Sequence, residues 1–175
     1  VSLAGLVIGA LFILPYLLFS ATSGQLAEKY SDTTIMRWVK NCEIAIMLLA
    51  AVGFMTQQAA VLLACTFLMG LHSTVFGPAK YSYLPRVLDE HELTGGNGMT
   101  EMGTFVAILL GNVAGGLLVA IPDIGHASVA VACVAVAVFG RWMSGRMPAL
   151  TATHPNEAIN WNPITETMRN LRLAR

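Results

Sequence analysis

Apolar residues are concentrated in five long segments that are separated by short polar stretches. The segments cover residues 1–23, 41–55, 59–83, 97–121 and 127–143. A helix needs roughly 20 residues, rising about 1.5 Å each, to cross a hydrocarbon layer of roughly 30 Å. Segments of this kind, repeated along one chain, are typical of a polytopic membrane protein. The pattern therefore predicts an all-α protein with five transmembrane helices.

The basic residues are distributed unevenly between the two ends of these segments. All 10 Lys and Arg residues lie at the end of the first, third or fifth segment or after it. The turns after the second and fourth segments, around Gln57 and around Asp123 to His126, contain neither Lys nor Arg. Positively charged residues are retained on the cytoplasmic side of a membrane. We therefore expect the start of the chain outside the cytoplasm and its tail inside.

Composition narrows the function classes further. The chain is 55% hydrophobic and 11% charged, which is too apolar for a soluble domain, and its formal net charge of +0 argues against nucleic acid as a partner. Cys42, Cys65 and Cys133 lie within apolar segments without the spacing of metal ligands, so we interpret them as buried apolar residues. No nucleophile–base pair or phosphate-binding loop is visible. We expect no catalysis, no metal and no cofactor.

The chain divides into a membrane part and a tail. Residues 1–145 are expected to form a partial transmembrane half, and residues 146–175 a cytoplasmic linker that is interrupted by prolines. Within the linker, a helix beginning at Asn162 would be amphipathic, with arginines on one face, and would lie on the inner leaflet. A solvated linker fits the same pattern. Because the chain begins at Val1 within an apolar run, we expect it to be an internal fragment.

Glu101 is the main candidate for binding among the ionisable residues within the segments. Such residues cost about 2.5–3.5 kcal/mol each on insertion scales, so each requires a reason. Glu101 shares a helical face with a group that favours a protein interior or a wet cavity over lipid: Phe105, Ile108, Asn112 and Gly115. The carboxylate either binds a substrate or a proton, or serves as a structural partner for Lys80 on the preceding helix.

Two further ionisable residues allow both a functional and a structural interpretation. Glu43 follows Lys40 by three residues and either pairs with it or has a role in binding. His72 lies in the third segment, with Phe76 and Tyr83 on its side of the helix. A lone histidine there either shuttles protons or packs in the interior.

The stretch between the first two segments resembles a known transporter signature. Its residues Gly24, Leu26, Ala27, Glu28 and Lys29 match the loop that joins the second and third helices of the major facilitator superfamily. In that family the loop holds the inner gate shut in one state through a charge network. Ser31 here replaces the second glycine of the pattern and Asp32 replaces an arginine. The charge network would therefore be weaker or use different residues, with Arg37 as a substitute for the missing arginine.

Two more motifs agree with this assignment of the segments to helices of the family. Gly77-Pro78-Ala79 resembles the end of the family's fourth helix. Gly111-Asn112-Val113-Ala114-Gly115-Gly116 resembles the glycine motif of its fifth helix, where Gly111, Gly115 and Gly116 would permit close helix contact. Asn112 stands where proline is usual in antiporters, which argues against proton antiport. The resemblance thus assigns the five segments to helices two to six of a twelve-helix fold, with other helices of the same protein as partners.

Three further runs narrow the resemblance within the superfamily: Gly77-Pro78-Ala79-Lys80-Tyr81, Gly95-Gly96-Asn97-Gly98 and Glu101-Met102-Gly103-Thr104-Phe105. They resemble the bacterial lysophospholipid transporters, most of all the form fused to an acyltransferase and an acyl-acyl-carrier-protein synthetase. The resemblance implies a location in the bacterial inner membrane, with a periplasmic start. It also implies movement of a lysophosphatidylethanolamine-like cargo to the cytoplasmic leaflet by alternating access.

The resemblance suggests roles for individual residues and leaves alternatives open. Lys80 would attract the phosphodiester of the cargo and Glu101 its ammonium group. A transporter of another small solute remains an alternative, as does the membrane anchor of a lysophospholipid acyltransferase, which would be fused or a partner. The match to the gating loop disfavours a purely structural subunit.

Overall fold

The computed structural model describes residues 3–156 and, beyond them, residues 159, 160, 162, 165, 168 and 172. Over this part of the chain the structure consists of helices without strands. The helices are α1 (Leu3–Lys29), α2 (Asp32–Thr56), α3 (Ala59–Val87), α4 (Leu93–Val119) and α5 (Gly125–Ser144). Each is long and apolar enough to cross a membrane. The prediction of an all-α chain with five transmembrane helices is confirmed.

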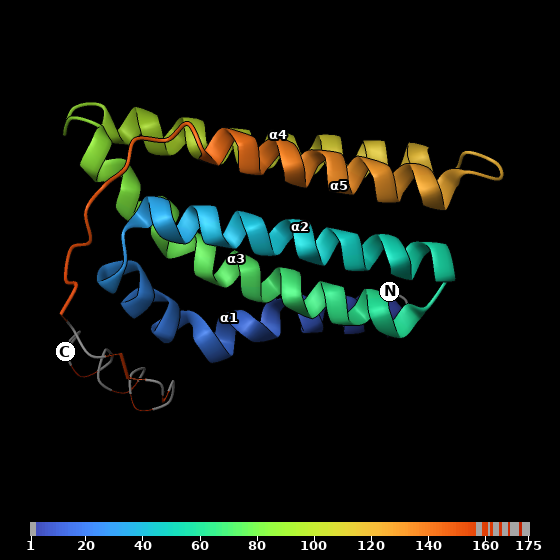
Figure 1. Cartoon of the computed structure of the whole chain (residues 1–175), viewed down its shortest axis with the longest axis horizontal. Helices are drawn as coiled ribbons and strands as arrows, with labels where there is room; N and C mark the ends of the chain where they lie inside the picture. The colour runs from blue at the N-terminus through green and yellow to red at the C-terminus, as the bar shows by residue number, and fades with distance from the viewer. Residues whose placement is uncertain are drawn as a thin grey trace.

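The helices lie side by side along the long axis of the molecule (Figure 1). Helix α3 contacts both α1 and α2, while α2 also contacts α5, and α4 packs on α5 with a smaller contact to α3. The α1–α2 and α3–α4 connections lie at the same end of the bundle as the end of α5 (Figure 1). We call this the connection end. The opposite end holds the start of α1 and the α2–α3 and α4–α5 turns.

Four of the helices extend beyond the predicted apolar segments at the connection end. Helix α2 begins at Asp32 rather than near residue 41, and α1 continues to Lys29 rather than stopping near residue 23. Helix α3 continues to Val87, and α4 begins at Leu93. The difference arises because hydropathy marks the lipid-embedded part of a helix, whereas backbone hydrogen bonds continue into its charged turns. The predicted loop between the first two spans is therefore mostly helical.

Two small apolar clusters form the interior between α1, α2 and α3. The cluster near the connection end contains Ala27, Ile35, Met36, Val39, Ala79 and Tyr83, with Met147 and Leu150 from beyond α5 packed against it. The second cluster, further along the bundle, contains Ile46, Ala50 and Cys65. Helix α4 has no buried residue among those described, so the described part of the chain does not cover the predicted interior face around Glu101.

Helices α1 and α3 approach each other closely at Gly70 of α3. A Cβ atom at this position would lie 2.2 Å from the carbonyl oxygen of Phe12 in α1 and 3.1 Å from the ring of Pro15. Only a glycine allows the two backbones to approach this closely. By contrast, a Cβ at Gly111, Gly115 or Gly116 would meet nothing within 4 Å. The described chain brings no second helix against these three glycines, and their role in packing stays a prediction.

The predicted amphipathic helix of residues 162–175 falls mostly outside the described residues. It stays a prediction. The segment from residue 146 to residue 156 is described and crosses the connection end of the bundle (Figure 1).

Candidate functional site

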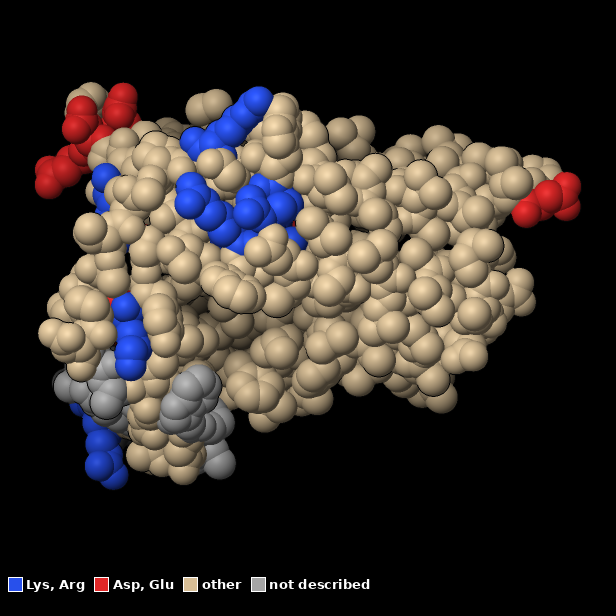
Figure 2. All heavy atoms as spheres, in the orientation of Figure 1, with Lys and Arg blue, Asp and Glu red and all other residues tan. Residues whose placement is uncertain are grey.

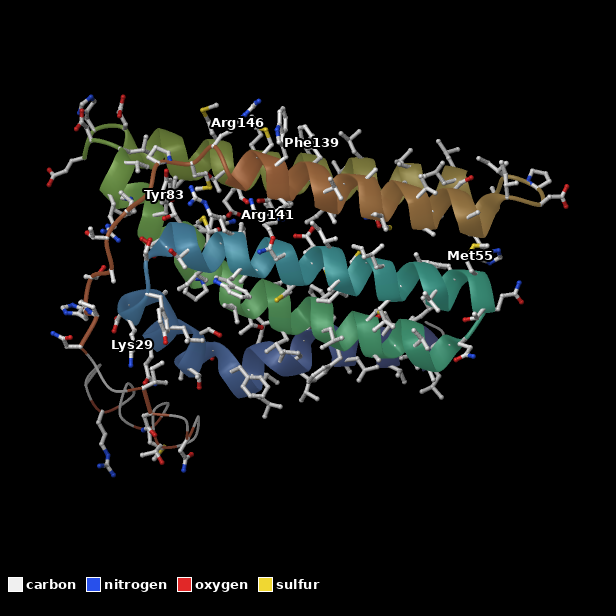
Figure 3. The ribbon with its side chains drawn as sticks, in the orientation of Figure 1. Lys29, Met55, Tyr83, Phe139, Arg141 and Arg146 are labelled. Carbon is white, nitrogen blue, oxygen red and sulfur yellow. The ribbon has the colours of Figure 1, made fainter. Side chains whose placement is uncertain are left out.

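Positive charge gathers toward the connection end of the molecule. In the view of Figure 2 the Lys and Arg atoms lie over this part of the surface, together with some acidic atoms, whereas the far end shows acidic atoms but no basic ones. Lys29, Arg141 and Arg146 lie toward the connection end and Met55 lies at the opposite end (Figure 3). The partition of charge expected from the sequence is thus present in three dimensions, because alternate helix ends meet on the same side.

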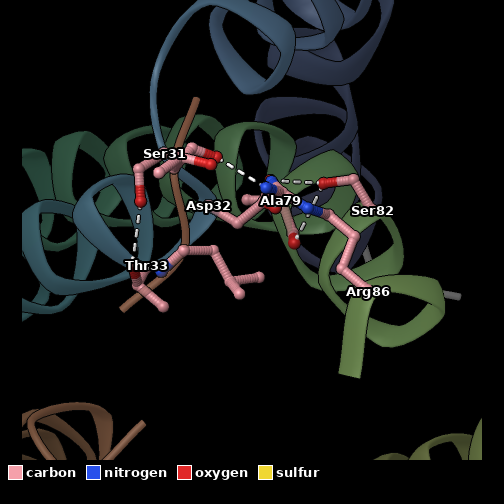
Figure 4. Close-up of polar contacts among 8 residues, drawn as sticks. Ser31, Asp32, Thr33, Ala79, Ser82 and Arg86 are labelled. Carbon is pink, nitrogen blue, oxygen red and sulfur yellow. Dashed lines mark hydrogen bonds and ion pairs between the residues drawn. The ribbon is translucent and has the colours of Figure 1, made fainter. Parts of the chain in front are cut away.

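A buried carboxylate organises the junction between α2 and α3. Asp32 is only 1% exposed. Its Oδ1 accepts a hydrogen bond of 2.5 Å from the Ser82 hydroxyl, and its Oδ2 lies 2.9 Å from Nη1 of Arg86 (Figure 4). Arg86 also donates from Nη2 to the carbonyl oxygen of Thr151 at 2.6 Å. Asp32 therefore joins the start of α2 to the end of α3 and, through Arg86, to the segment after α5.

The predicted gating residues are arranged differently from the expectation. Gly24, Leu26, Glu28 and Lys29 belong to the last turns of α1, where the backbone carbonyl of Glu28 accepts a hydrogen bond of 2.9 Å from the amide of His154. Among the described residues, no ion pair involves the side chains of Glu28 or Lys29. The charge network of this region instead uses Asp32 and Arg86.

Arg37 does not take part in that network. Its guanidinium donates to the carbonyl oxygens of Ser144, Gly145 and Met147 at 3.4, 3.5 and 3.0 Å, and so caps the end of α5. A helix C-terminus carries unpaired carbonyls and a partial negative charge, both of which favour a cation. In this structure Arg37 therefore caps α5, and its expected role as a substitute for the missing arginine of the gating loop stays a prediction.

Sequence reasoning missed Ser82 and Arg86. A signal for them was available, since Asp32 is an acidic residue in the first turn of α2 and Arg86 is a basic residue in the last turn of α3. Both lie at the same end of adjacent helices. Their pairing depends on the contact between α2 and α3, which an apolar pattern alone does not specify.

The described residues that follow α5, 146–156 with 159 and 160, cross the connection end, and we call this segment the strap. The amide of Leu150 donates to the Thr33 hydroxyl at 3.3 Å, and the amide of Asn160 donates to Oε1 of Gln25 at 2.7 Å. Together with the bonds to Glu28, Arg37 and Arg86, these contacts tie the strap to α1, α2 and α3. Residues 146–156 are thus attached to the helix ends, and the division at residue 145 into a transmembrane half and a linker stays a prediction.

Lys80 and Glu101 are brought together as the sequence suggested. Lys80 Nζ lies 3.6 Å from Oε1 of Glu101, and the Tyr81 hydroxyl also donates to this carboxylate. The side chain of Glu101 is 44% exposed and that of Lys80 is 23% exposed. Asn112 is exposed further along α4 and is not part of this group. The pair lies on the open surface of α3 and α4.

A second polar group is more deeply buried between α2 and α3. Lys40 Nζ lies 2.6 Å from Oε2 of Glu43, and Nε2 of His72 lies 3.1 Å from the same oxygen. The side chains of Glu43 and His72 are 12% and 7% exposed. The His72 ring stacks on Phe76 with centroids 6.1 Å apart, and Lys40 Nζ lies 5.2 Å from the centre of the Phe76 ring. The two residues that the sequence left ambiguous, Glu43 and His72, are therefore partners.

Two cavities adjoin this buried group. The first, of about 280 Å³, lies between the α2–α3 pair and the α4–α5 pair and is lined by Glu43 together with Gly111, Gly115 and apolar residues such as Met47 and Val136. The second, of about 420 Å³, lies between α2 and α3 and is lined by His72 among apolar residues.

Other polar contacts fix the position of α5. Arg141 Nε donates to Oδ1 of Asn41 in α2 at 2.6 Å, and the Arg146 guanidinium lies 3.6 Å from the centre of the Trp142 ring. The labelled side chain of Arg141 lies on the side of α5 that faces α2 (Figure 3). Within the described part of the chain, no cluster of His, Cys, Asp and Glu has the arrangement of a metal site.

Comparison with known proteins agrees with this arrangement. The family model of the Major Facilitator Superfamily matches residues 1–174. The lysophospholipid transporter LplT of Serratia proteamaculans is 30% identical over 156 residues, and that of Escherichia coli O7:K1 is 31% identical over 157 residues. Each alignment covers 89% of this chain but only 36% of the relative. The chain thus spans about a third of the length of these curated relatives. No solved structure matches it.

Proposed function

The chain belongs to the major facilitator superfamily, and from this premise we propose that it forms part of a transporter that moves lysophospholipid to the cytoplasmic leaflet by alternating access. The observation that carries the proposal is the similarity to the lysophospholipid transporters over 89% of the chain. The structure adds support, because cavities lined mainly by apolar residues adjoin a small number of charged side chains. An amphipathic cargo requires both features.

The exposed pair of Lys80 and Glu101 is proposed to meet the headgroup at the rim of the path. Lys80 lies seven residues before the end of α3, and Glu101 lies eight residues after the start of α4, so each is about 10–12 Å from the connection end of its helix. A phosphodiester would be attracted to Lys80 and an ammonium group to Glu101. Because the pair is partly exposed, a headgroup can reach both charges without a change in the bundle.

The inner latch of the transporter is proposed to be the junction between α1, α2 and α3. Gly24, Leu26, Glu28 and Lys29 form its α1 side, while the Asp32–Arg86 pair supplies the charge contact that holds the helix ends together. Alternating access in this family moves one half of the protein against the other. A half whose helix ends are tied by a buried ion pair and by the strap can move as one body.

The membrane orientation and the partners are part of the same proposal. The chain is a multi-pass protein of the bacterial inner membrane, and we place the connection end, where basic residues gather, in the cytoplasm. Because the relatives are about three times as long, the site is proposed to be completed by further transmembrane helices of the same protein. An acyltransferase, fused or separate, would consume the delivered lysophospholipid.

Uptake of labelled lysophosphatidylethanolamine into spheroplasts tests the proposal. The full-length protein that contains this chain would be compared with an empty vector and with the Glu101→Gln variant at equal abundance. We expect uptake by the full-length protein and reduced uptake by the variant. Uptake that is equal in both would retain the cargo and remove Glu101 from the site. No uptake above the empty vector, with the protein folded in the membrane, would refute the lysophospholipid proposal and leave the family membership alone.

A further inference from the structure

We propose that Tyr81 is a positioning residue for headgroup binding, because its hydroxyl fixes the carboxylate of Glu101 while its ring holds the ammonium group of Lys80 close by. Both charges then stay open to a ligand. The role rests on the proposed function, in which Lys80 and Glu101 meet a zwitterionic lysophospholipid at the rim of the path. Tyr81 acts through these two residues and does not itself have to contact the cargo.

Three side chains from two helices meet at one carboxylate oxygen. The Tyr81 hydroxyl donates a hydrogen bond to Oε1 of Glu101, and Lys80 Nζ lies 3.6 Å from the same oxygen. Lys80 Nζ also lies 4.5 Å from the centre of the Tyr81 ring. Consecutive residues of a helix point about 100° apart, so the long Lys80 side chain has to turn toward Tyr81 for this contact to form. Tyr81 thus contacts both charges of the pair.

The distance between the two charges shows what the tyrosine does. At 3.6 Å, Lys80 Nζ is attracted to Glu101 but lies beyond the usual length of a hydrogen bond. In the buried pair of Lys40 and Glu43 the corresponding distance is 2.6 Å. At Glu101 the hydrogen bond to Oε1 comes from Tyr81 instead. Lys80 is therefore near its partner without being bound tightly to it.

The second oxygen of Glu101 remains open for a ligand. Both contacts of this carboxylate with described residues involve Oε1. The side chain of Glu101 is 44% exposed and Tyr81 is 45% exposed, so an ammonium group can approach Oε2. A carboxylate has about four lone-pair positions on its two oxygens, which allows several donors at once. Glu101 can therefore accept a hydrogen bond from the cargo and keep the one from Tyr81.

The tyrosine becomes essential when Lys80 turns to a phosphate. Glu101 then keeps only Tyr81 as a partner among the described residues. The contacts of Lys80 and Tyr81 with Glu101 are also the only polar contacts between α3 and α4 in the described part of the chain. Without the Tyr81 hydroxyl, the released carboxylate would sample many orientations in water. Orienting a binding group in advance lowers the cost of ordering it when the ligand arrives.

Tyr83 provides a matched control on the same helix. It lies two residues beyond Tyr81, is 9% exposed, and packs in the apolar cluster near the connection end. Its hydroxyl has no hydrogen-bond partner among the described residues. Replacement by phenylalanine therefore removes a contact at Tyr81 and none at Tyr83, although the chemical change is identical.

Concentration-dependent uptake of labelled lysophosphatidylethanolamine by spheroplasts expressing the full-length protein tests the role. We expect Tyr81→Phe to raise KM about fivefold, because the carboxylate loses its hydrogen bond, and to leave Vmax within about twofold. We expect Tyr83→Phe to leave both quantities near the parental values. A tyrosine that only supported the fold would lower Vmax through the amount of active protein and would not change KM.

Combination with Glu101→Gln shows whether Tyr81 acts through this carboxylate. We expect Glu101→Gln alone to raise KM about tenfold, and the addition of Tyr81→Phe to raise it by less than about twofold more. Two residues that bind independently would instead give fold-changes that multiply. All variants would be compared at equal abundance, with melting temperatures measured in detergent to exclude misfolding.

The outcomes separate this role from the transport proposal. An unchanged KM in Tyr81→Phe or in Glu101→Gln, an equal rise in Tyr83→Phe, or fold-changes that multiply would overturn the positioning role and leave transport in place. Absence of uptake by the folded parent would overturn the transport proposal and this role with it. Should Glu101→Gln unfold the protein, the comparison of Tyr81→Phe with Tyr83→Phe decides alone.

Discussion

Asp32, the first residue of α2, lies 2.9 Å from Arg86, in the last turn of α3, although 54 positions separate them in the sequence. Asp32 is 1% exposed, whereas the side chain of Arg86 is 28% exposed and also reaches the strap. The contact therefore joins three parts of the chain at the connection end. Because Asp32 is buried and Arg86 is partly exposed, substitution of either residue should change the free energy of unfolding by a different amount.

Removal of the cation is expected to be more damaging than removal of the anion. Arg86→Gln leaves a buried carboxylate with only the Ser82 hydroxyl as partner, which should lower the free energy of unfolding by about 2–3 kcal/mol. Asp32→Asn removes the charge but retains an oxygen acceptor for Ser82, so we expect a loss of about 1 kcal/mol. Thermal unfolding of the full-length protein in detergent measures both. The ranking is refuted if Asp32→Asn is the more destabilising change.

Gly70 and Gly77 lie two turns apart in α3, and their substitution by alanine should change stability in opposite directions. Gly70→Ala places a Cβ atom 2.2 Å from the Phe12 carbonyl oxygen and should destabilise the α1–α3 contact by about 1–3 kcal/mol. At Gly77 nothing lies within 4 Å, so alanine should stabilise the helix by about 0.5–1 kcal/mol. Melting temperatures of the two variants test this directly, and a similar shift for both would contradict the close crossing.

Loss of the Arg37 cap should loosen the end of α5 without unfolding the bundle. In Arg37→Gln three carbonyl oxygens of residues 144–147 lose their donor, at a cost of about 1 kcal/mol. The locally open population then rises about fivefold, and trypsin cleavage after Arg146 should accelerate by a similar factor. Arg141→Gln is the matched control, because Arg141 contacts Asn41 instead of these carbonyls. Equal acceleration in both variants would argue against the cap.

The orientation of the bundle can be tested with single cysteines. Asp123→Cys lies in the α4–α5 turn and Glu90→Cys lies in the α3–α4 connection, on opposite ends of the molecule. With Cys42, Cys65 and Cys133 replaced by alanine, a membrane-impermeant maleimide should label Asp123→Cys in spheroplasts and Glu90→Cys only after permeabilisation. The reverse pattern would invert the proposed orientation.

The apolar pattern of the sequence was sufficient to predict the number and approximate positions of the helices. It was sufficient because each transmembrane helix satisfies its own backbone hydrogen bonds, so its existence depends mainly on local hydrophobicity. The same pattern failed at the helix ends, where charged residues such as Asp32 and Arg37 belong to helices. The resemblance carried by Gly24 to Lys29 and by Gly111 to Gly116 was sufficient for the family, which the family model confirms.

The polar contacts between helices were decided only by the tertiary structure. The sequence suggested the pairing of Lys80 with Glu101 because they carry opposite charges on adjacent helices, and the structure brings them together. It left Glu43 and His72 as separate, ambiguous residues and missed Arg86. Which charged side chain meets which depends on the rotation of each helix and on how closely neighbours approach, as at Gly70. Local hydrophobicity carries no information on either quantity, because both are set by packing between segments that are distant in sequence.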